Sequence, residues 1–220
     1  MTSARGNLTT LALMEEMWPF RLMPGARLPI EIPDVSRDVD LPLLFREAGF
    51  HVGVEVGVEQ GVYAELLCQV VPGLKLHAVD CWQAYSGYRD HVNQEKLDGF
   101  YEATLKRTAL YDVEVIRDWS VEAAKEFDAA SVDFVYLDAN HDFANVVKDL
   151  AAWAPKVRRG GVVAGHDYIL RKNKAIMHHV VQAVRGWTEC YGIDPWFLLG
   201  RKARVEGEVR DDNRSWMWVR

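Results

Sequence analysis

The sequence has few cysteines, no excess of positive charge and no long apolar run, and each shortage argues against a class of protein. Its 3 cysteines are too few and too scattered for a disulfide framework or a zinc site, and they fit a reducing compartment. The net charge of −6 argues against a protein that binds nucleic acid by covering phosphates. The N-terminus holds only a short apolar patch before Glu15 and Glu16, unlike a signal peptide or a membrane span. We therefore expect a cytoplasmic protein without nucleic-acid or membrane partners.

The composition is that of an ordinary globular domain. Of the 220 residues, 49% are apolar and 26% are charged, which is enough to form a buried core. Residues 1–40 begin with a short helix-like piece at residues 8–17 and are otherwise irregular. The prolines at positions 19, 24, 29 and 33 predict an extended N-terminal arm or lid rather than core elements. Residues 41–220 are regular and form the main predicted domain.

Strand-like and helical patterns alternate in the main domain. The predicted strands are residues 51–57, 75–80, 113–118, 132–138 and 161–167. The predicted helices are residues 41–48, 62–71, 99–109, 121–127, 145–157 and 175–188. This alternation predicts right-handed crossovers and a doubly wound, mostly parallel sheet, the Rossmann-like α/β class. Residues 195–200 and 215–219 have no helix between them, which predicts an antiparallel C-terminal hairpin at one edge of a seven-stranded sheet.

The first predicted strand of this domain runs into a glycine-containing turn, Glu55-x-Gly57-x-x-x-Gly61. Gly57 permits a tight turn, and Gly61 permits close packing of the next helix against the sheet. Glu59 stands where a dinucleotide-binding motif has its middle glycine. A carboxylate there repels a pyrophosphate, so a cofactor without phosphates, or a cationic one, is favoured. Asp80 ends the second strand, where an acidic side chain commonly accepts hydrogen bonds from a ribose.

Polar and aromatic residues follow the second and third strands. Asp118, Trp119 and Ser120 are suited to framing an adenine by stacking and hydrogen bonding, or alternatively to capping the next helix. The long segment after the second strand contributes aromatic rings that can cover a cofactor, stack on an acceptor ring or serve packing alone: Trp82, Tyr85 and Tyr88.

Two later strands end in groups capable of chemistry. Residues 132–138 end at Asp138, with His141 three positions further on, and the next strand ends at His166 and Asp167. Parallel strands present their carboxyl ends at one edge of the sheet, so these four side chains are expected to converge. A histidine with a near-neutral pKa can serve as a general base.

The acidic and imidazole groups at these strand ends allow two interpretations. Asp138, His166 and Asp167 can bind a divalent cation, or they can form a hydrogen-bonded cluster that orients His141 or the substrate. Magnesium prefers oxygen ligands, whereas imidazole suits manganese, iron or zinc. His178 and His179 fall within a predicted helix and are interpreted as surface or packing residues.

These motifs resemble those of class I S-adenosylmethionine-dependent methyltransferases. Within that superfamily they resemble the branch of small-molecule and sugar O-methyltransferases that includes macrolide-sugar methyltransferases. The resemblance covers about residues 41–187. It rests on the following motifs: Glu55-x-Gly57-x-x-x-Gly61, Asp80, Asp138-x-x-His141, Gly160-Gly161 and His166-Asp167.

The resemblance implies a cofactor, a reaction and a set of roles. Glu55, Gly57 and Gly61 would hold the methionine end of S-adenosylmethionine. Asp80 would bind the ribose, and Asp118 to Ser120 would bind the adenine. His141 would be the general base, and Asp138 and Asp167 would position the acceptor hydroxyl. Metal-assisted relatives imply that Asp138, His166 and Asp167 hold magnesium or manganese.

Alternatives to this reading stay open. A nicotinamide-dependent oxidoreductase on a similar sheet is opposed by Glu59. A non-catalytic cofactor-binding protein is opposed by the cost of burying two histidines and two aspartates without a purpose. We expect a small-molecule acceptor, a sugar or a glycosylated natural product. A homodimer is compatible with the N-terminal arm, which could cover its own site or that of a neighbour.

Overall fold

The computed structural model describes residues 9–85, 93–170, 178–201 and 213–220. Its strands are β1 (Ile30–Ile32), β2 (Val52–Val56), β3 (Lys75–Asp80), β4 (Val113–Arg117), β5 (Val132–Leu137), β6 (Val157–Gly165), β7 (Trp196–Leu199) and β8 (Ser215–Val219). Its helices are α1 (Thr10–Met17), α2 (Asp40–Glu47), α3 (Val62–Val70), α4 (Gln94–Thr108), α5 (Ser120–Ala123), α6 (Phe143–Trp153) and α7 (Val180–Cys190). The predicted α/β class is confirmed.

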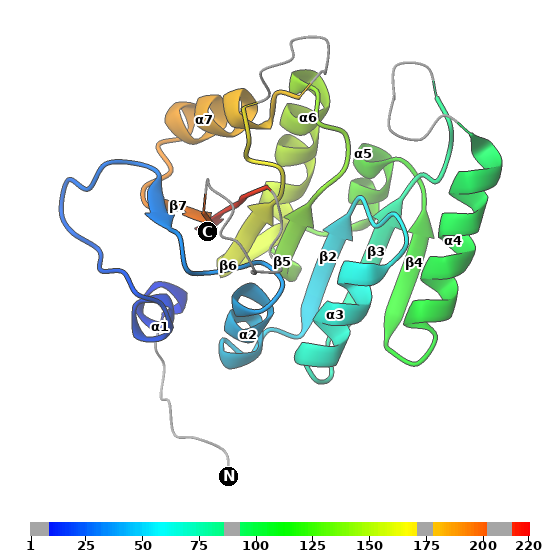
Figure 1. The fold of residues 1–220 in the computed structure, drawn as a ribbon, viewed down its shortest axis with the longest axis horizontal. Coiled ribbons are helices and arrows are strands. Elements are labelled where there is room, and N and C mark those ends of the chain that lie inside the picture. Colours follow the sequence, from blue (N-terminus) through cyan, green and yellow to red (C-terminus); the bar gives the residue numbers. More distant parts are fainter. Residues whose placement is uncertain (1–8, 86–92, 171–177, 202–212) are drawn as a thin grey trace.

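The strands form one sheet in the order β1-β7-β8-β6-β5-β2-β3-β4 (Figure 1). Every neighbouring pair is parallel except those made by β8, which runs antiparallel to both β6 and β7. The predicted antiparallel C-terminal pair is therefore present. The strand order reverses between β2 and β5, so the carboxyl ends of these two strands open a crevice where ligands bind in folds of this kind.

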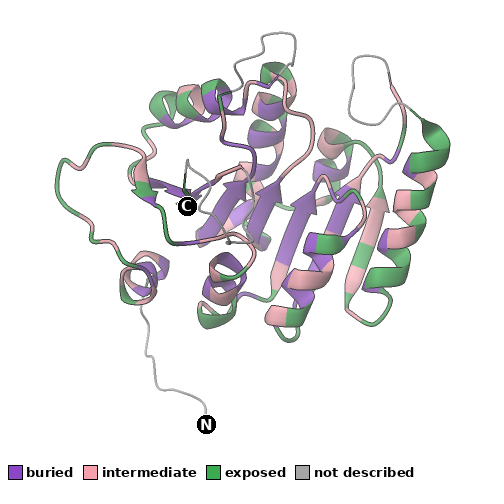
Figure 2. Ribbon diagram, viewed as in Figure 1, coloured by how far each residue is buried: buried purple, intermediate pink, exposed green. Residues whose placement is uncertain are grey.

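The sheet separates two hydrophobic cores, because successive side chains of a strand point to opposite faces. In β5, Phe134 and Tyr136 pack with α1 to α4, whereas Val135 and Leu137 pack with α5 to α7. Figure 2 shows the central strands almost entirely buried between these helical layers. A parallel strand buried on both faces is expected to read as a continuous apolar run, as the sequence of β5 does.

The N-terminal arm differs from the extended segment that its prolines predict. Residues Ile30–Ile32 add an eighth strand to the seven expected, and β1 rather than the C-terminal hairpin occupies the edge of the sheet. Ile32 is fully buried, and Met14 of α1 and Trp18 join the same core. The arm thus contributes to the fold, and its role as a lid stays a prediction.

Two helix boundaries also differ from those expected. The helix expected from residue 99 begins at Gln94, because the Asn93 side chain accepts a hydrogen bond from the Glu95 amide and caps it. The helix expected from residue 175 is described only from residue 178 on, and α7 begins at Val180. Tyr88 lies outside the described residues. None of the described helices has the length and apolar character needed to cross a membrane.

Candidate active site

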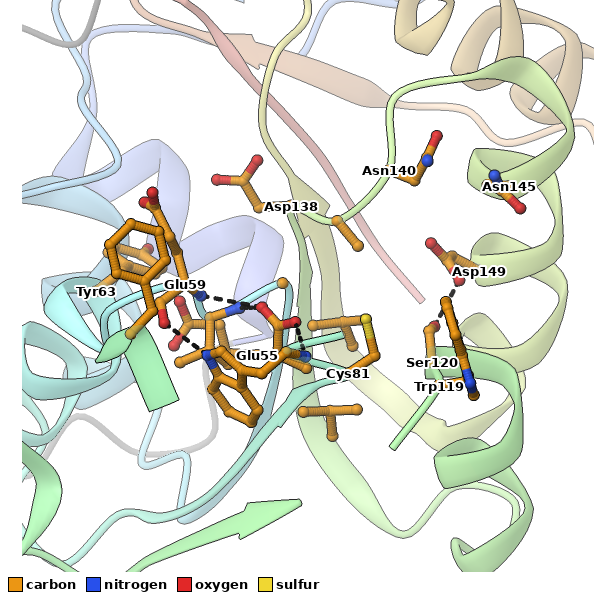
Figure 3. Close-up of a pocket in the computed structure, with 18 of the residues that line it drawn as sticks. Glu55, Glu59, Tyr63, Cys81, Trp119, Ser120, Asp138, Asn140, Asn145 and Asp149 are labelled. Carbon is orange, nitrogen blue, oxygen red and sulfur yellow. Dashed lines mark hydrogen bonds between the residues drawn. The ribbon is translucent and has the colours of Figure 1, made fainter. Parts of the chain in front are cut away.

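A cavity of about 750 Å³ opens at the carboxyl ends of β2, β3 and β5 (Figure 3). Six of the residues expected to bind a cofactor line it: Glu55, Gly57, Asp80, Trp82, Trp119 and Ser120. Gly61 and Asp118 are not among the lining residues. Gly61 instead begins α3 with φ 75° and faces α4, where an added Cβ would lie 3.0 Å from Thr104. The Asp118 carboxylate accepts a hydrogen bond from the neighbouring Trp119 amide.

The loop after β2 is held against the neighbouring strand ends. Gly57 has φ 89°, and a Cβ there would lie 2.1 Å from the Asp138 carbonyl oxygen, so β2 and β5 are in direct backbone contact. Glu59 adopts a left-handed φ of 53°, at the position where the dinucleotide motif has glycine. Its carbonyl accepts hydrogen bonds from the Trp82 indole at 2.8 Å and from the Thr104 hydroxyl at 3.2 Å.

Asp80 ties this loop to the end of β3. Its Oδ2 accepts hydrogen bonds from the amides of Val58 and Glu59 at 2.9 and 3.0 Å, and its Oδ1 accepts one from the Trp82 amide at 3.1 Å. A carboxylate offers about four lone pairs, so capacity remains on the cavity side for a ligand hydroxyl. The same side chain can therefore shape the loop and bind a ribose.

The carboxyl group of Glu55 is buried and lines the cavity. Burial and the charge of Asp138 raise the pKa of Glu55 well above its usual range, and Arg37 offsets only part of this effect. Its Oε2 has no hydrogen-bond partner among the described residues. A buried, unpartnered carboxyl group in a cavity favours a ligand with a cationic group.

At the opposite end of the cavity, Ser120 and Asp149 form a polar pair. The Ser120 hydroxyl donates to Asp149 Oδ1 at 2.5 Å and accepts from the Trp153 indole at 3.0 Å. Burial raises the pKa of Asp149 to about 6 despite the Ser120 hydrogen bond. Sequence reasoning missed Asp149, although an acid among the apolar residues of one helix face, here Val146, Leu150 and Trp153, is a usable signal.

The four polar side chains at the ends of β5 and β6 lie together. His141 Nε2 is 2.8 Å from Asp167 Oδ2 and 3.7 Å from Asp138 Oδ1. His166 Nδ1 is 3.5 Å from Asp138 Oδ2 and 3.7 Å from Asp167 Oδ1. His141 and Asp138 also line the cavity, so this cluster and the cofactor residues face one space.

The charged groups of this cluster shift one another's pKa values. Burial lowers the pKa of His141, but Asp138 and Asp167 outweigh that effect and raise it to about 10. Burial raises the pKa of both carboxyls, yet the neighbouring imidazoles more than reverse this and hold both well below their usual range. The cluster thus retains two carboxylates that stabilise positive charge, whether a proton or another cation.

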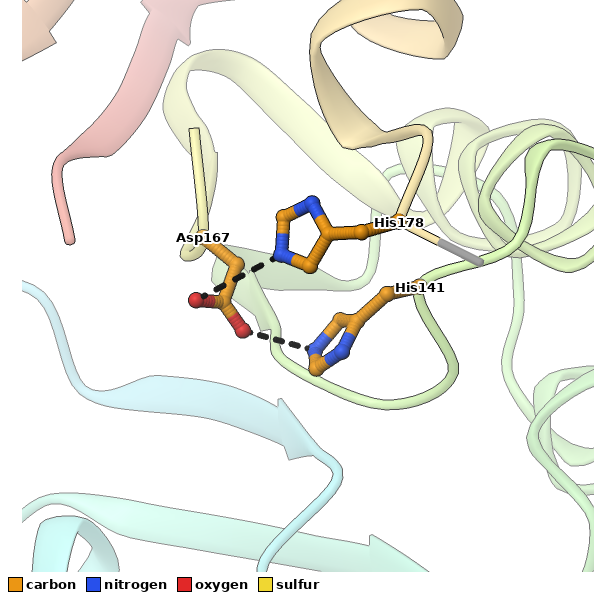
Figure 4. Close-up of side chains that lie close together, drawn as sticks. All are labelled: His141, Asp167 and His178. Carbon is orange, nitrogen blue, oxygen red and sulfur yellow. Dashed lines mark ion pairs between the residues drawn. The ribbon is translucent and has the colours of Figure 1, made fainter. Parts of the chain in front are cut away.

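His178 joins the cluster, which corrects its interpretation as a surface or packing residue. It lies just before α7, and its Nε2 is 3.7 Å from Asp167 Oδ1 (Figure 4). Its ring centroid is 5.1 Å from that of His141. Two sets of side chains are close enough to hold a metal ion: Asp138, His166 and Asp167, and His141, Asp167 and His178. Nothing in the sequence pattern reveals the second set, because it depends on how α7 packs.

Arg37 brings a cation from the N-terminal arm into the site. Its Nη1 lies 3.1 Å from Asp138 Oδ2 and 3.3 Å from the Tyr136 hydroxyl. Its guanidinium stands over the Tyr63 ring at 5.1 Å from the centroid. Sequence reasoning missed this residue too, because the arm carries no periodic pattern that places it near β5.

The sheet order, with its one reversed strand and the cavity at the β2–β5 crevice, defines the Rossmann-like methyltransferase fold. The chain matches the family model described as "Methyltransferase domain" over residues 54–168, just over half of its length. It therefore belongs to this methyltransferase family, and the resemblance to class I methyltransferases seen in the sequence is confirmed.

Solved structures share this fold at low sequence identity. The O-methyltransferase from Bacillus cereus, in complex with SAH, matches with a TM-score of 0.58 and 19% identity over 85% of this chain and 83% of that chain. The O-methyltransferase TomG from Streptomyces achromogenes, involved in tomaymycin synthesis and in complex with SAM, matches with a TM-score of 0.59 and 20% identity over 81% of this chain and 77% of that chain.

A relative is also found by sequence. The protein y4gI of Sinorhizobium fredii (strain NBRC 101917 / NGR234) is 27% identical over 148 residues, which is 64% of this chain. The match spans 15% of that relative's length.

Proposed function

We propose that the protein is an S-adenosylmethionine-dependent methyltransferase that acts on a hydroxyl of a small molecule, a sugar or a glycosylated natural product. The observation that carries this proposal is one cavity, which joins the cofactor-type residues at the ends of β2 and β3 to Asp138 and His141, the members of the acid–base cluster that follow β5. The SAH and SAM held by the solved neighbours support the choice of cofactor.

The cofactor is assigned to the cavity by charge and polarity. The methionine end carries an ammonium group and a sulfonium, which the buried carboxyl of Glu55 is suited to stabilise. Asp80 accepts from the ribose hydroxyls. Trp119, Ser120 and Asp149 surround the adenine with one aromatic face and hydrogen-bonding groups (Figure 3).

The transfer step needs a proton acceptor. The acceptor oxygen forms a bond to the methyl carbon as the carbon–sulfur bond breaks, and the hydroxyl proton passes to His141. Asp167 Oδ2 lies 2.8 Å from Nε2 of that ring as an ion-pair partner, so Nδ1 is the nitrogen assigned to accept the proton. A pKa of about 10 keeps His141 protonated at neutral pH in the ligand-free protein. Positive charge entering the cavity disfavours the imidazolium, so we expect this pKa to fall when ligands bind.

Metal assistance is the second part of the proposal. Asp138, His166 and Asp167 present ligand atoms within 4.8 Å of one another, and carboxylate with imidazole is a donor set that divalent cations accept. These residues fit a metal ion, which, when bound, would lower the pKa of an acceptor hydroxyl and fix its orientation.

Calorimetric titration with S-adenosylhomocysteine tests the cofactor. We expect binding in the micromolar range, and no heat at near-millimolar ligand would contradict the proposal. A fluorescence titration with a reduced nicotinamide cofactor is the matched control, since Glu59 in the loop after β2 is expected to prevent its binding.

The role of His141 is tested by His141→Ala in a panel of hydroxylated acceptors, with S-adenosylhomocysteine release as the readout. We expect turnover to fall by roughly 10²–10⁴-fold with nearly unchanged cofactor affinity, as for loss of a general base. The control is His51→Ala, at an exposed position beside the opposite end of β2, which should leave both quantities unchanged. Loss of cofactor affinity in His141→Ala would make the residue structural.

A further inference from the structure

His178 is a buried imidazole that the proposed methyl transfer does not use. Its side chain is 4% exposed, and neither ring nitrogen has a hydrogen-bond partner among the described residues. Burying polar atoms without partners is unfavourable, and such groups in native proteins normally mark an interaction with something else. Figure 4 shows the ring directed at Asp167, beside His141.

Three nitrogen-to-oxygen distances between imidazoles of this cluster and the carboxylates of Asp138 and Asp167 are nearly equal. His178 Nε2 and His166 Nδ1 each lie 3.7 Å from Asp167 Oδ1, and His166 Nδ1 lies 3.5 Å from Asp138 Oδ2. These distances are too long for hydrogen bonds. Ligands about 2.0–2.2 Å from one tetrahedral ion are roughly 3.3–3.6 Å apart, so each of these pairs is spaced much like atoms that share a metal. His178 and the pair Asp138 and His166 belong to two sets that have Asp167 in common, so one ion would draw His178 toward the other ligands.

His141 is placed differently from the other two imidazoles. Its Nε2 is 2.8 Å from the other oxygen of Asp167, Oδ2, as an ion-pair partner, although the pair does not have hydrogen-bond geometry. Asp167 can therefore offer Oδ1 to an ion while Oδ2 faces the ring of His141. This division of the carboxylate keeps the proposed base beside the ion and outside its ligand set.

We propose that His178 completes a metal site with Asp138, His166 and Asp167, and that this site selects an imidazole-binding transition metal such as manganese, iron, cobalt or zinc over magnesium. Two imidazoles and two carboxylates are the donor set of such metals, whereas magnesium requires oxygen ligands in near-octahedral geometry. The proposal deepens the proposed function, but metal binding itself is measured without methyl transfer.

Two neighbouring donors already contact the carboxylate ligands. Arg37 lies 3.1 Å from Asp138 Oδ2, and the Asn213 amide donates to Asp167 Oδ1. A carboxylate oxygen has two lone pairs, so each can accept this bond and still face an ion. The guanidinium charge weakens binding of any cation here, and it does so without distinguishing magnesium from a transition metal.

The test uses the full chain after removal of metal with a chelator. Calorimetric titrations with manganese, zinc, cobalt and magnesium are expected to show one transition-metal ion per chain, bound at least 100-fold more tightly than magnesium. Cobalt is expected to give visible absorption bands of an imidazole- and carboxylate-bound ion. In His178→Ala the affinity for transition metals should fall at least tenfold, while His141→Ala and the exposed control His51→Ala should stay within about threefold.

Each part of the proposal can be overturned by a separate result. Equal affinity for magnesium and manganese would overturn the selectivity, and unchanged affinity in His178→Ala would overturn its assignment as a ligand. A loss in His141→Ala as large as that in His178→Ala would move the ion to the set His141, Asp167 and His178 and overturn the site proposed. His178→Gln is the second variant if His178→Ala does not fold. S-adenosylhomocysteine binding, measured on the same samples, separates failure of the metal site from failure of the proposed function.

Discussion

Gly57 is the residue at which the loop after β2 meets the backbone of Asp138. Its φ of 89° is a conformation that residues with a Cβ rarely adopt, and the added atom would lie 2.1 Å from the Asp138 carbonyl oxygen, which belongs to the backbone and cannot rotate away. The same carbonyl is part of the segment that positions His141. A substitution at Gly57 is therefore expected to displace both the loop after β2 and the segment that leads to His141.

Gly57→Ala is expected to lower the free energy of unfolding by about 3 kcal/mol or more, because backbone strain and a backbone clash act together. The matched control is Gly99→Ala, inside α4, where an added Cβ meets nothing within 4 Å. That change should instead stabilise the protein by about 0.5–1 kcal/mol through helix propensity. Urea unfolding of the two variants measures both values, and similar effects in the two would contradict the role given to Gly57.

Asp149 makes stability depend on pH in a defined direction. Burial raises its pKa from 3.8 to about 6, with Asp142 also raising it and Ser120 and Lys148 lowering it. Because the folded protein disfavours the ionised form, the contribution of Asp149 to stability is complete below about pH 3.8 and is lost as the pH rises through 6.

Asp149→Asn removes this ionisation. Relative to the wild type, we expect the variant to become more stable by about 2–3 kcal/mol between pH 4 and pH 7, since one pKa unit corresponds to about 1.4 kcal/mol. Urea unfolding at several pH values provides the measurement. A stability difference between Asp149→Asn and the wild type that does not change with pH would rule out the effect.

The residues of the site differ in how far the sequence reveals them. Asp138, His141, His166 and Asp167 could be found because each follows an apolar strand, and parallel strands end at a common edge. His178, Arg37 and Asp149 could not be placed in this way. Their positions depend on the packing of α7, the arm and α6. Of the three, Asp149 alone carries a local signal, as an acid on the apolar face of α6.

At the scale of the element, β1 is the strand that the sequence pattern does not predict. Three residues between proline-containing turns are too short to display the alternation that predicts a strand. The structure pairs Ile30–Ile32 with β7 in parallel, and the Gly200 amide donates to the Ile32 carbonyl at 3.1 Å. The seven longer strands were predictable because each carries a run or an alternation of apolar residues, from the mostly buried β5 to the partly exposed edge strand β4.

Ile32→Ala tests whether this short strand contributes to stability. Its side chain is fully buried, so we expect a loss of about 2–4 kcal/mol in the free energy of unfolding, from lost burial and the cavity left behind. Glu31→Gln, at the exposed position of the same strand, leaves no cavity and is expected to cost less than Ile32→Ala, although it removes the 3.4 Å ion pair with Arg214, whose side chain is 11% exposed. A negligible loss in Ile32→Ala would mean that β1 is held only loosely on the sheet.

At the scale of the whole molecule, fold class and strand order were not equally predictable. Alternating strand and helix patterns predict a doubly wound sheet, since crossovers are right-handed and helices must cover both faces. The patterns do not state which strands are neighbours. The strand order depends on how side chains from many segments pack into the two cores, one on each face of the sheet, so no single segment encodes it.

The family match covers residues 54–168, whereas Arg37 enters the same cluster from outside that range. The segment before the matched domain therefore supplies a positive charge to a cluster whose other members lie within that domain or after it. Under the proposed function, replacing Arg37 would change the charge that an acceptor meets, and the strands that end at this cluster would stay as they are.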